Sequence, residues 1–495
     1  MKLMFNEDWI HFIWTRYENN INITEEVLKK FIYQYKDTQV TDFVMNVNGS
    51  VSTYPSKTRQ SYCDKYMATK ECGIDVNYKD TFAKKAYEVF VEKGLDMYKI
   101  WIDTAKNIGI KPWISIRMND CHGNGKDPEL RQSEYIISHP EQWRIRHRVA
   151  DEYHDRCLDF EVEEVRENLL SYIEETLERY RPYGLELDFS RETYMFVPGR
   201  EQKGRKHLND MMRKIKVLTQ KYGTLSVNVV LNGSVSTNLE MGLDPILWAK
   251  EGLIDSVVNI GRWETTNTNP EIELWKSVLG KKVEFGCGQQ LLIKAFPQSR
   301  DIISSIETAF GEACANFCNG ADFVYLYNYM DMPEQGLEDI DHPKSIRQSE
   351  NLEIILKNIG DYKTALTQKR AHVLTYDDFL PPWKGHISRL PIEFEKGTRQ
   401  YIKILTGQVR DEEYAQLVLA FDRVLDGKSM EVFVNSVPAK FIDNGGIDKN
   451  ISDSFGCVFN IVNVDELGGN TVIEIKLYEE AVLKFAQIVI SEKGE

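Results

Sequence analysis

The most constraining feature of this chain is the alternation of short β-rich runs with long helical patterns over its first two thirds. Such alternation is typical of repeated strand-helix units around a parallel sheet. The runs that predict strands are 10–14, 40–47, 111–118, 184–189, 225–231, 254–263, 281–288 and 322–329. Eight strands, each followed by a helical stretch, predict an α/β fold, the closed (β/α)8 TIM barrel. A doubly wound open sheet is the alternative, because eight parallel strands can also stay open.

A change of pattern near Lys369 predicts a second domain. From there the chain reads as short alternating runs, such as 401–407 and 471–478, without helical stretches between them. That is the pattern of antiparallel strands in a small all-β sandwich. We therefore expect a barrel domain over 1–368 and a β-sandwich domain over 369–495, a division that suits a chain of 495 residues.

The formal net charge of -15 excludes some classes of partner. A strongly acidic chain is repelled by phosphate backbones and by anionic membrane surfaces, so we expect neither nucleic acid nor a membrane as a partner. The start of the chain lacks the continuous apolar stretch of a secretion signal, and no apolar run approaches the roughly 18 residues of a membrane span. We therefore expect a soluble, cytoplasmic protein, and a homo-oligomer is left open.

The eight cysteines show no CxxC pair and no His-rich cluster beside them. This spacing predicts neither a zinc site nor a thiol redox pair, and reduced, mostly buried thiols are the expected state. We accordingly expect no metal and no cofactor.

The run GLELDFSRE at 184–192 crowds charges around a predicted buried strand. Side chains alternate along a strand, so Glu186 and Asp188 are expected to point together into the barrel. Burying two carboxylates costs several kcal/mol unless they are paired, which favours a functional role over packing. We expect Asp188, nearest the open end, to react, and Glu186 to be a support that pairs with an arginine such as Arg117. In the alternative, both acids only pair with barrel arginines.

A second carboxylate is needed if the site cleaves a glycosidic bond, since one group protonates the leaving oxygen and the other attacks or activates water. Glu264 ends the sixth predicted strand beside Trp263, which can stack on a sugar ring and exclude water from a neighbouring carboxyl. Glu192 and Glu284 are the alternatives. We favour the pair Asp188 and Glu264.

The segment 157–192 resembles bacterial family-10-like glycoside hydrolases, in which a helix leads into a "DG-I-x-L-D-F/Y-x-R" run on the fourth barrel strand. The similarity extends more loosely over residues 8–335. It implies a (β/α)8 barrel with a C-terminal β-sandwich, hydrolysis of glycosides, and the motif's aspartate and arginine at Asp188 and Arg191. The sequence departs from the motif at Tyr183, where an Asp is common. Acids on the fourth and sixth strands also resemble α-galactosidase-like barrels, which favours a retaining mechanism with Asp188 as nucleophile.

Other polar residues at predicted strand ends form a candidate sugar-binding rim. They offer donors and acceptors to sugar hydroxyls, and asparagine recurs at the ends of the second, fifth and eighth strands. The candidate substrate-binding residues are His11, Arg117, Asn119, Asp120, His122, Glu186, Arg191, Asn232, Trp263 and Asn328.

Two other enzyme classes fit the sequence less well. A phosphate-handling barrel would carry a Gly-rich loop after its seventh or eighth strand, and neither loop here has one. A metal hydrolase would place several histidines at strand ends, and only His11 and His122 qualify. The sequence therefore predicts a glycosidase acting on a carbohydrate substrate, with a non-catalytic carbohydrate-binding barrel as the alternative.

Overall fold

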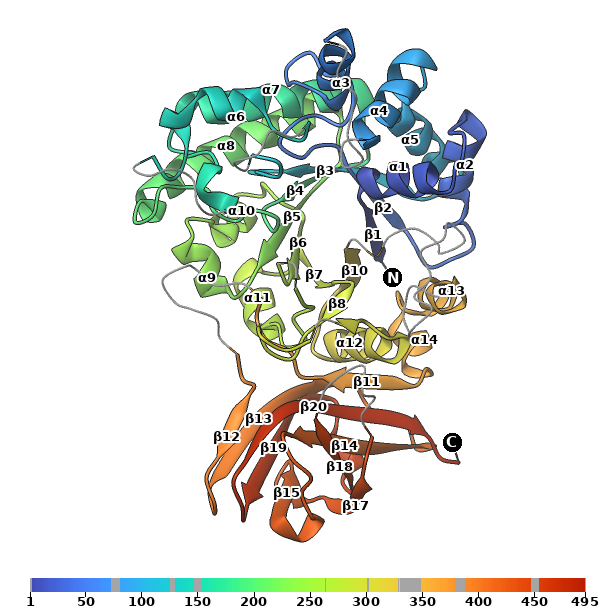
Figure 1. Ribbon diagram of the computed structural model, residues 1–495, viewed down its shortest axis with the longest axis vertical. Coiled ribbons are helices and arrows are strands. Elements are labelled where there is room, and N and C mark those ends of the chain that lie inside the picture. The colour runs from blue at the N-terminus through green and yellow to red at the C-terminus, as the bar shows by residue number, and fades with distance from the viewer. Residues whose placement is uncertain are drawn as a thin grey trace.

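The computed structural model consists of two stacked parts, a barrel and a β-sandwich, drawn at the top and bottom of Figure 1. The described residues are 2–72, 81–124, 130–146, 153–262, 264–300, 302–327, 329, 349–378, 388–446 and 454–494.

Within the described residues, eight parallel strands close into a barrel in the order β1-β10-β7-β6-β5-β4-β3-β2. Their bounds are β1 Leu3–Glu7, β2 Asp42–Asn46, β3 Lys111–Arg117, β4 Gly184–Asp188, β5 Ser226–Asn232, β6 Ser256–Ile260, β7 Glu284–Gln289 and β10 Phe323–Tyr327. A short hairpin of β8 (Leu292–Ile293) and β9 (Ile302–Ile303) lies outside the barrel sheet. The predicted closed barrel is confirmed, and the open sheet is excluded.

The first predicted strand, 10–14, is wrong, because these residues belong to helix α1 (Trp9–Glu18). The first barrel strand is β1, just upstream. Asp8 separates the two elements: its side chain accepts a hydrogen bond from the Ile10 backbone N–H and so caps the helix. Phe12 and Ile13 are both buried, as adjacent residues on a helix face can be, whereas successive residues of a half-buried strand point to opposite sides.

Helices surround the barrel strands (Figure 1). The helices that precede and follow β4 are amphipathic and bury one face each. The α-helices are α1, α2 (Glu25–Tyr33), α3 (Tyr62–Glu71), α4 (Thr81–Tyr87), α5 (Met97–Asn107), α6 (Glu134–Ser138), α7 (Glu163–Tyr180), α8 (Glu201–Tyr222), α9 (Val235–Glu240), α10 (Pro245–Lys250), α11 (Ile272–Leu279), α12 (Ile306–Cys318), α13 (Ser349–Asn358) and α14 (Tyr362–Leu366).

Gly184 begins β4 at the base of the barrel, where the Trp113 ring fills the space beside it. A Cβ atom at Gly184 would lie 2.1 Å from that ring, so only glycine fits. The Trp113 indole N–H donates to Asp42 Oδ1 at 2.8 Å, which fixes the ring in this place. The base of the barrel is therefore a packed core, and the polar interior lies above it.

The second part consists of antiparallel sheets. One has the order β11-β20-β14-β18-β17, with β12 also paired to β20, and the other has the order β13-β19-β15-β16. Their bounds are β11 Arg370–Val373, β12 Ile392–Phe394, β13 Arg399–Thr406, β14 Glu413–Phe421, β15 Met430–Val434, β16 Val437–Pro438, β17 Lys440–Asn444, β18 Phe455–Asn460, β19 Gly469–Leu477 and β20 Ala481–Glu492. The predicted β-sandwich is confirmed.

Helix α12 joins the two parts by packing directly on β11 (Figure 1). A Cβ atom at Gly311 would lie 2.1 Å from the Ala371 carbonyl oxygen, so the helix backbone approaches the strand without a side chain between them. Beside this contact, the Arg370 guanidinium donates to both oxygens of Glu413 at 2.7 Å, and both side chains are buried. The contact therefore ties the sandwich to the barrel.

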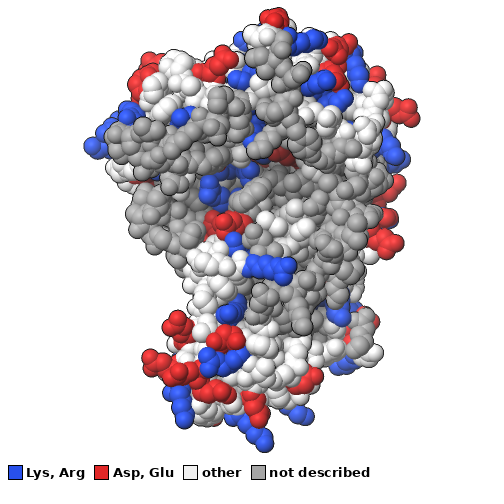
Figure 2. Space-filling model, in the orientation of Figure 1, with Lys and Arg blue, Asp and Glu red and all other residues white. Residues whose placement is uncertain are grey.

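The surface carries both signs of charge. Acidic and basic side chains are interspersed on the visible face of the β-sandwich (Figure 2). Among the described helices, none has the length and apolarity that crossing a bilayer would require.

Candidate active site

Glu186 lies in the middle of β4 and is fully buried inside the barrel. Its Oε1 accepts a hydrogen bond from the Tyr325 hydroxyl at 2.8 Å, and its Oε2 accepts one from the Asn228 amide at 2.8 Å. Burial, together with the nearby charge of Asp188, raises the pKa of Glu186 to about 7 despite these donors. The predicted pairing of Glu186 with Arg117 is wrong, because the guanidinium binds other carboxylates.

Asp188 ends β4 one layer above Glu186 and is 2% exposed. Its Oδ1 accepts hydrogen bonds from the Ser190 backbone N–H at 2.7 Å and from the Ser190 hydroxyl at 2.6 Å. Its Oδ2 accepts one from the Tyr327 hydroxyl at 3.0 Å. Three donors therefore fix the orientation of this carboxylate.

The two tyrosines come from β10, which stands opposite β4 in the closed order of strands. Tyr325 and Tyr327 are two residues apart, so both point into the barrel and reach across it to the two carboxylates. Sequence reasoning missed these partners, because alternation in FVYLY places both tyrosines on one face of the strand but does not show that this face lies opposite β4.

The Arg117 guanidinium organises the charged rim of the barrel. It donates to Asp8 at 2.7 Å and to Asp120 at 3.3 Å. Burial alone would raise the pKa of Asp120, but the His122 ring and Arg117 hold it well below its usual range. His122 lies 2.8 Å from Asp120 through Nδ1, and its Nε2 is 3.2 Å from the Arg191 guanidinium. The structure thus brings four predicted rim residues together and adds Asp8, which the sequence reasoning missed.

Two predicted rim asparagines hold loops together. The Asn119 amide donates to the Leu158 carbonyl at 2.9 Å and accepts from the Leu158 N–H at 3.0 Å. Asn232 accepts from the Thr193 hydroxyl at 3.0 Å and donates to the Ile260 carbonyl at 3.0 Å. Both side chains are buried, so their contacts favour a structural role.

His11 was predicted at the end of a strand, and the structure corrects this position. It lies on helix α1, where its Nδ1 is 3.0 Å from the buried carboxylate of Glu7. Trp263 and Asn328, two further predicted ligand contacts, lie outside the described residues.

Glu264 follows β6, and its side chain is 45% exposed. Its Oε2 accepts a hydrogen bond from the Tyr376 hydroxyl at 2.6 Å and lies 3.1 Å from the Lys294 ammonium. The backbone N–H of Glu264 donates to Asp378 at 2.6 Å. Residues that follow β11 therefore hold this predicted acid in place.

The two alternative acids lie in different surroundings. Glu192 follows β4, is 2% exposed and lies 3.4 Å from the Arg262 guanidinium; burial raises its pKa. Glu284 begins β7, at the end of the barrel opposite to Asp188, where its exposed carboxylate pairs with Lys2 at 2.8 Å. A pairing of Glu284 with Asp188 across one pocket is therefore contradicted by the fold.

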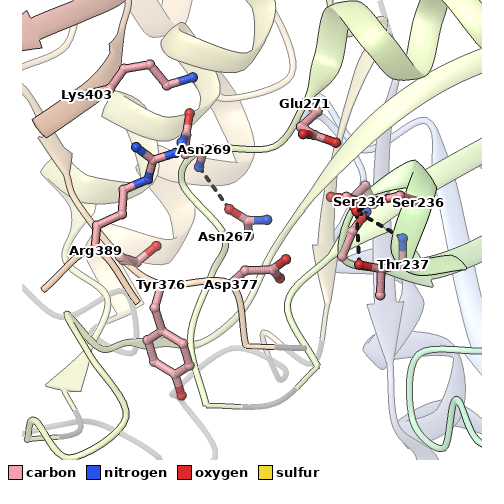
Figure 3. Close-up of a pocket in the computed structure, with 13 residues that line it drawn as sticks. Ser234, Ser236, Thr237, Asn267, Asn269, Glu271, Tyr376, Asp377, Arg389 and Lys403 are labelled. Atoms are coloured by element: carbon pink, nitrogen blue, oxygen red, sulfur yellow. Dashed lines mark hydrogen bonds between the residues drawn. The ribbon is translucent and has the colours of Figure 1, made fainter. Parts of the chain in front are cut away.

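A cavity of about 350 Å³ lies where the barrel loops meet the sandwich. Figure 3 shows Arg389 and Lys403 on one side of it, with Glu271 and the Ser234 to Thr237 turn facing them. Tyr376 also lines this cavity, and its hydroxyl reaches Glu264. The cavity is thus polar and neighbours Glu264, whereas Asp188 lies inside the barrel.

Comparisons with known proteins give only distant likenesses. No family model and no curated protein matches the chain. An α-L-fucosidase from Paenibacillus thiaminolyticus is similar in structure at 11% identity and a TM-score of 0.40, over 67% of this chain and 46% of that protein. An α-L-fucosidase from a Vibrio species has 9% identity and a TM-score of 0.37, over 98% of this chain and 96% of that protein. A GH36 α-galactosidase from Geobacillus stearothermophilus has 12% identity and a TM-score of 0.39, over 96% of this chain and 55% of that protein.

These values are too low to assign a family or an activity. The chain spans less than half the length of the Paenibacillus fucosidase, and every TM-score is below 0.5. The fold rests on the closed barrel itself, and the resemblance to family-10-like glycosidases stays a prediction.

Proposed function

We propose that the protein hydrolyses O-glycosidic bonds in a carbohydrate substrate, at the carboxyl end of its barrel. The observation that supports this most is Asp188, a buried carboxylate at the last position of β4 with three hydrogen-bond donors fixed on it. Enzymes of this fold build their active sites at that end of the strands. A preoriented carboxylate there suits attack on an anomeric carbon or stabilisation of the charge that develops on it.

Glu264 is our proposal for the second carboxylate. Of the three acids considered, it is the one at the carboxyl end of a strand whose side chain is substantially exposed and so within reach of a ligand. Tyr376 and Lys294 hold it in one orientation. In the proposed retaining mechanism, Asp188 attacks the anomeric carbon while Glu264 protonates the leaving oxygen and later activates water.

The rim supplies groups that suit sugar hydroxyls. Asp120, His122 and Arg191 form a connected chain of acceptors and donors at this end of the barrel. Inside the barrel, both amide atoms of Asn46 are buried without a hydrogen-bond partner among the described residues. Buried polar groups normally have a hydrogen-bond partner in the protein, in water or in a ligand, so Asn46 supports the binding of a polar ligand inside the barrel.

The test is hydrolysis of aryl glycosides whose leaving groups differ in acidity. Asp188→Asn should abolish turnover of every substrate while the far-UV spectrum and melting temperature stay close to those of the wild type. Glu264→Gln should lose far more activity on poor leaving groups than on activated ones, because activated phenols leave without a proton donor.

Glu192→Gln is the matched comparison, since it removes the alternative acid, which follows Asp188 after the end of β4. If Glu192→Gln shows the leaving-group dependence and Glu264→Gln does not, the assignment of the proton donor is wrong. If Asp188→Asn keeps wild-type turnover, Asp188 is not the nucleophile, whereas the proposed function itself fails if the wild type cleaves no glycoside.

A non-catalytic carbohydrate-binding barrel is the second candidate, and one observation favours it. Both oxygens of Asp188 already accept hydrogen bonds, as in a purely structural carboxylate. This candidate predicts that the wild-type protein binds members of a broad panel of glycosides, as measured by calorimetry, but cleaves none of them.

A further inference from the structure

Three potential metal ligands from separate segments of the chain meet near the rim. Cys121 follows β3, Cys157 precedes α7, and Glu192 follows β4. Their ligand atoms all lie within 4.8 Å of one another, and the two sulfurs are 3.5 Å apart. All three side chains are buried. The cluster has no CxxC spacing because its members are brought together by the fold, so the sequence pattern did not indicate it.

Glu192 is a buried carboxylate that lies beside the two thiols. Among the described residues, the ion-pair partner of Glu192 is Arg262, at a separation of 3.4 Å. A bound cation would add to the compensation that this guanidinium gives the buried carboxylate.

We propose that Cys121, Cys157 and Glu192 bind one Zn²⁺ ion. Two thiolates select a soft or borderline cation, and the carboxylate favours Zn²⁺ over Cu⁺. In a tetrahedral site with Zn–S bonds of about 2.3 Å, the two sulfurs lie about 3.8 Å apart, close to the 3.5 Å observed. The three protein ligands leave a fourth position for water.

The charges of the proposed site balance. On binding, the two thiols release their protons to solvent and form bonds to the metal as thiolates. Two thiolates and one carboxylate then carry three negative charges, against two positive charges on Zn²⁺ and one on the Arg262 guanidinium beside Glu192.

A metal at this position would cross-link the loops that carry the rim. The residue after Cys121 is His122, and the residue before Glu192 is Arg191, two side chains in contact with each other. The ion would fix these loops relative to the segment before α7. It would also remove Glu192 from the set of proton donors, since its carboxylate would be a ligand. The site itself does not depend on the proposed glycosidase activity.

The experiment measures how much zinc the full chain binds. The protein is stripped with a chelator under reducing conditions, incubated with ZnCl2, freed of excess metal and analysed by inductively coupled plasma mass spectrometry. We expect one zinc per chain in the wild type and in the control Cys287→Ser, which removes a buried thiol outside the cluster. We expect at least about a 100-fold weaker zinc affinity in Cys157→Ser and in Glu192→Gln, measured against a competing chelator.

A second measurement needs no variant. Wild-type protein loaded with Co²⁺ should show a thiolate-to-cobalt charge-transfer band and the strong visible absorption of a tetrahedral site. The proposal is overturned if the wild type retains no more zinc than Cys157→Ser, if Glu192→Gln binds zinc as tightly as the wild type, or if the cobalt spectrum lacks sulfur ligation. The proposal would also be overturned if Cys121 and Cys157 form a disulfide and the protein binds no zinc after that disulfide is reduced.

Discussion

Replacing Glu186 by glutamine should remove one titrating group from the pH dependence of barrel stability between about pH 5 and pH 7. The pKa of Glu186 in the folded protein is about 7, against a usual value of 4.5. Between these two values the folded state holds a proton that the unfolded state has released. Rising pH therefore favours unfolding, and the stability contributed by the protonated acid is lost as the pH passes through the folded pKa.

The size of the effect follows from the shift. One pKa unit corresponds to about 1.4 kcal/mol, so raising the pKa from 4.5 to about 7 makes the wild type less stable by about 3 kcal/mol above pH 7 than below pH 4.5. The amide of Glu186→Gln does not titrate, and the Tyr325 hydroxyl can accept from it as readily as it donates to the carboxylate. Relative to the wild type, the variant should therefore gain stability as the pH rises.

The assay is urea unfolding followed by tryptophan fluorescence at several pH values. Eight of the nine tryptophans lie before residue 369, so the signal reports the barrel. Glu284→Gln is the matched control, because it removes an exposed glutamate from the same barrel. A difference between wild type and Glu186→Gln that stays constant from pH 5 to pH 7.5 would refute the reasoning.

Three further substitutions test the packing and the site. Gly184→Ala forces a methyl group into the Trp113 ring and should cost about 2 to 3 kcal/mol in urea unfolding, whereas a loss below about 0.5 kcal/mol would contradict the close approach. Arg370→Met removes two charged hydrogen bonds from the buried Glu413, which keeps Arg410 as a partner, so the free energy of unfolding should fall by about 2 to 3 kcal/mol, and adding Glu413→Gln should recover part of it. Tyr327→Phe removes a donor to the proposed nucleophile and should lower kcat about 10- to 100-fold on cleaved glycosides; unchanged kcat would exclude this role.

Sequence periodicity predicted the barrel because seven of its strands are short buried runs bounded by helical stretches. It failed at the first strand, where LMFNE and the apolar residues of α1 follow each other with only Asp8 between them. Both segments carry buried apolar residues, so hydrophobicity alone does not separate them. The helix cap at Asp8 is the local signal that does.

Alternation along β4 correctly predicted that Glu186 and Asp188 share the inward face, but it could not supply their partners. Whether an inward carboxylate meets Arg117 or a tyrosine depends on which strand stands opposite, and that follows only from the closed order of the barrel. The same limit hid the cluster of Cys121 and Cys157, whose sulfurs touch although 36 residues separate them in the chain.

The hydrogen bonds between β4 and β10 also bear on how the chain acquires its structure. The acids of β4 are synthesised well over a hundred residues before the tyrosines that satisfy them, since β10 ends at Tyr327. Until that strand emerges from the ribosome, an early barrel assembly would hold two buried carboxylates without these donors. Incomplete barrels are therefore penalised, and closure by the last strand becomes the step that commits the domain to its fold.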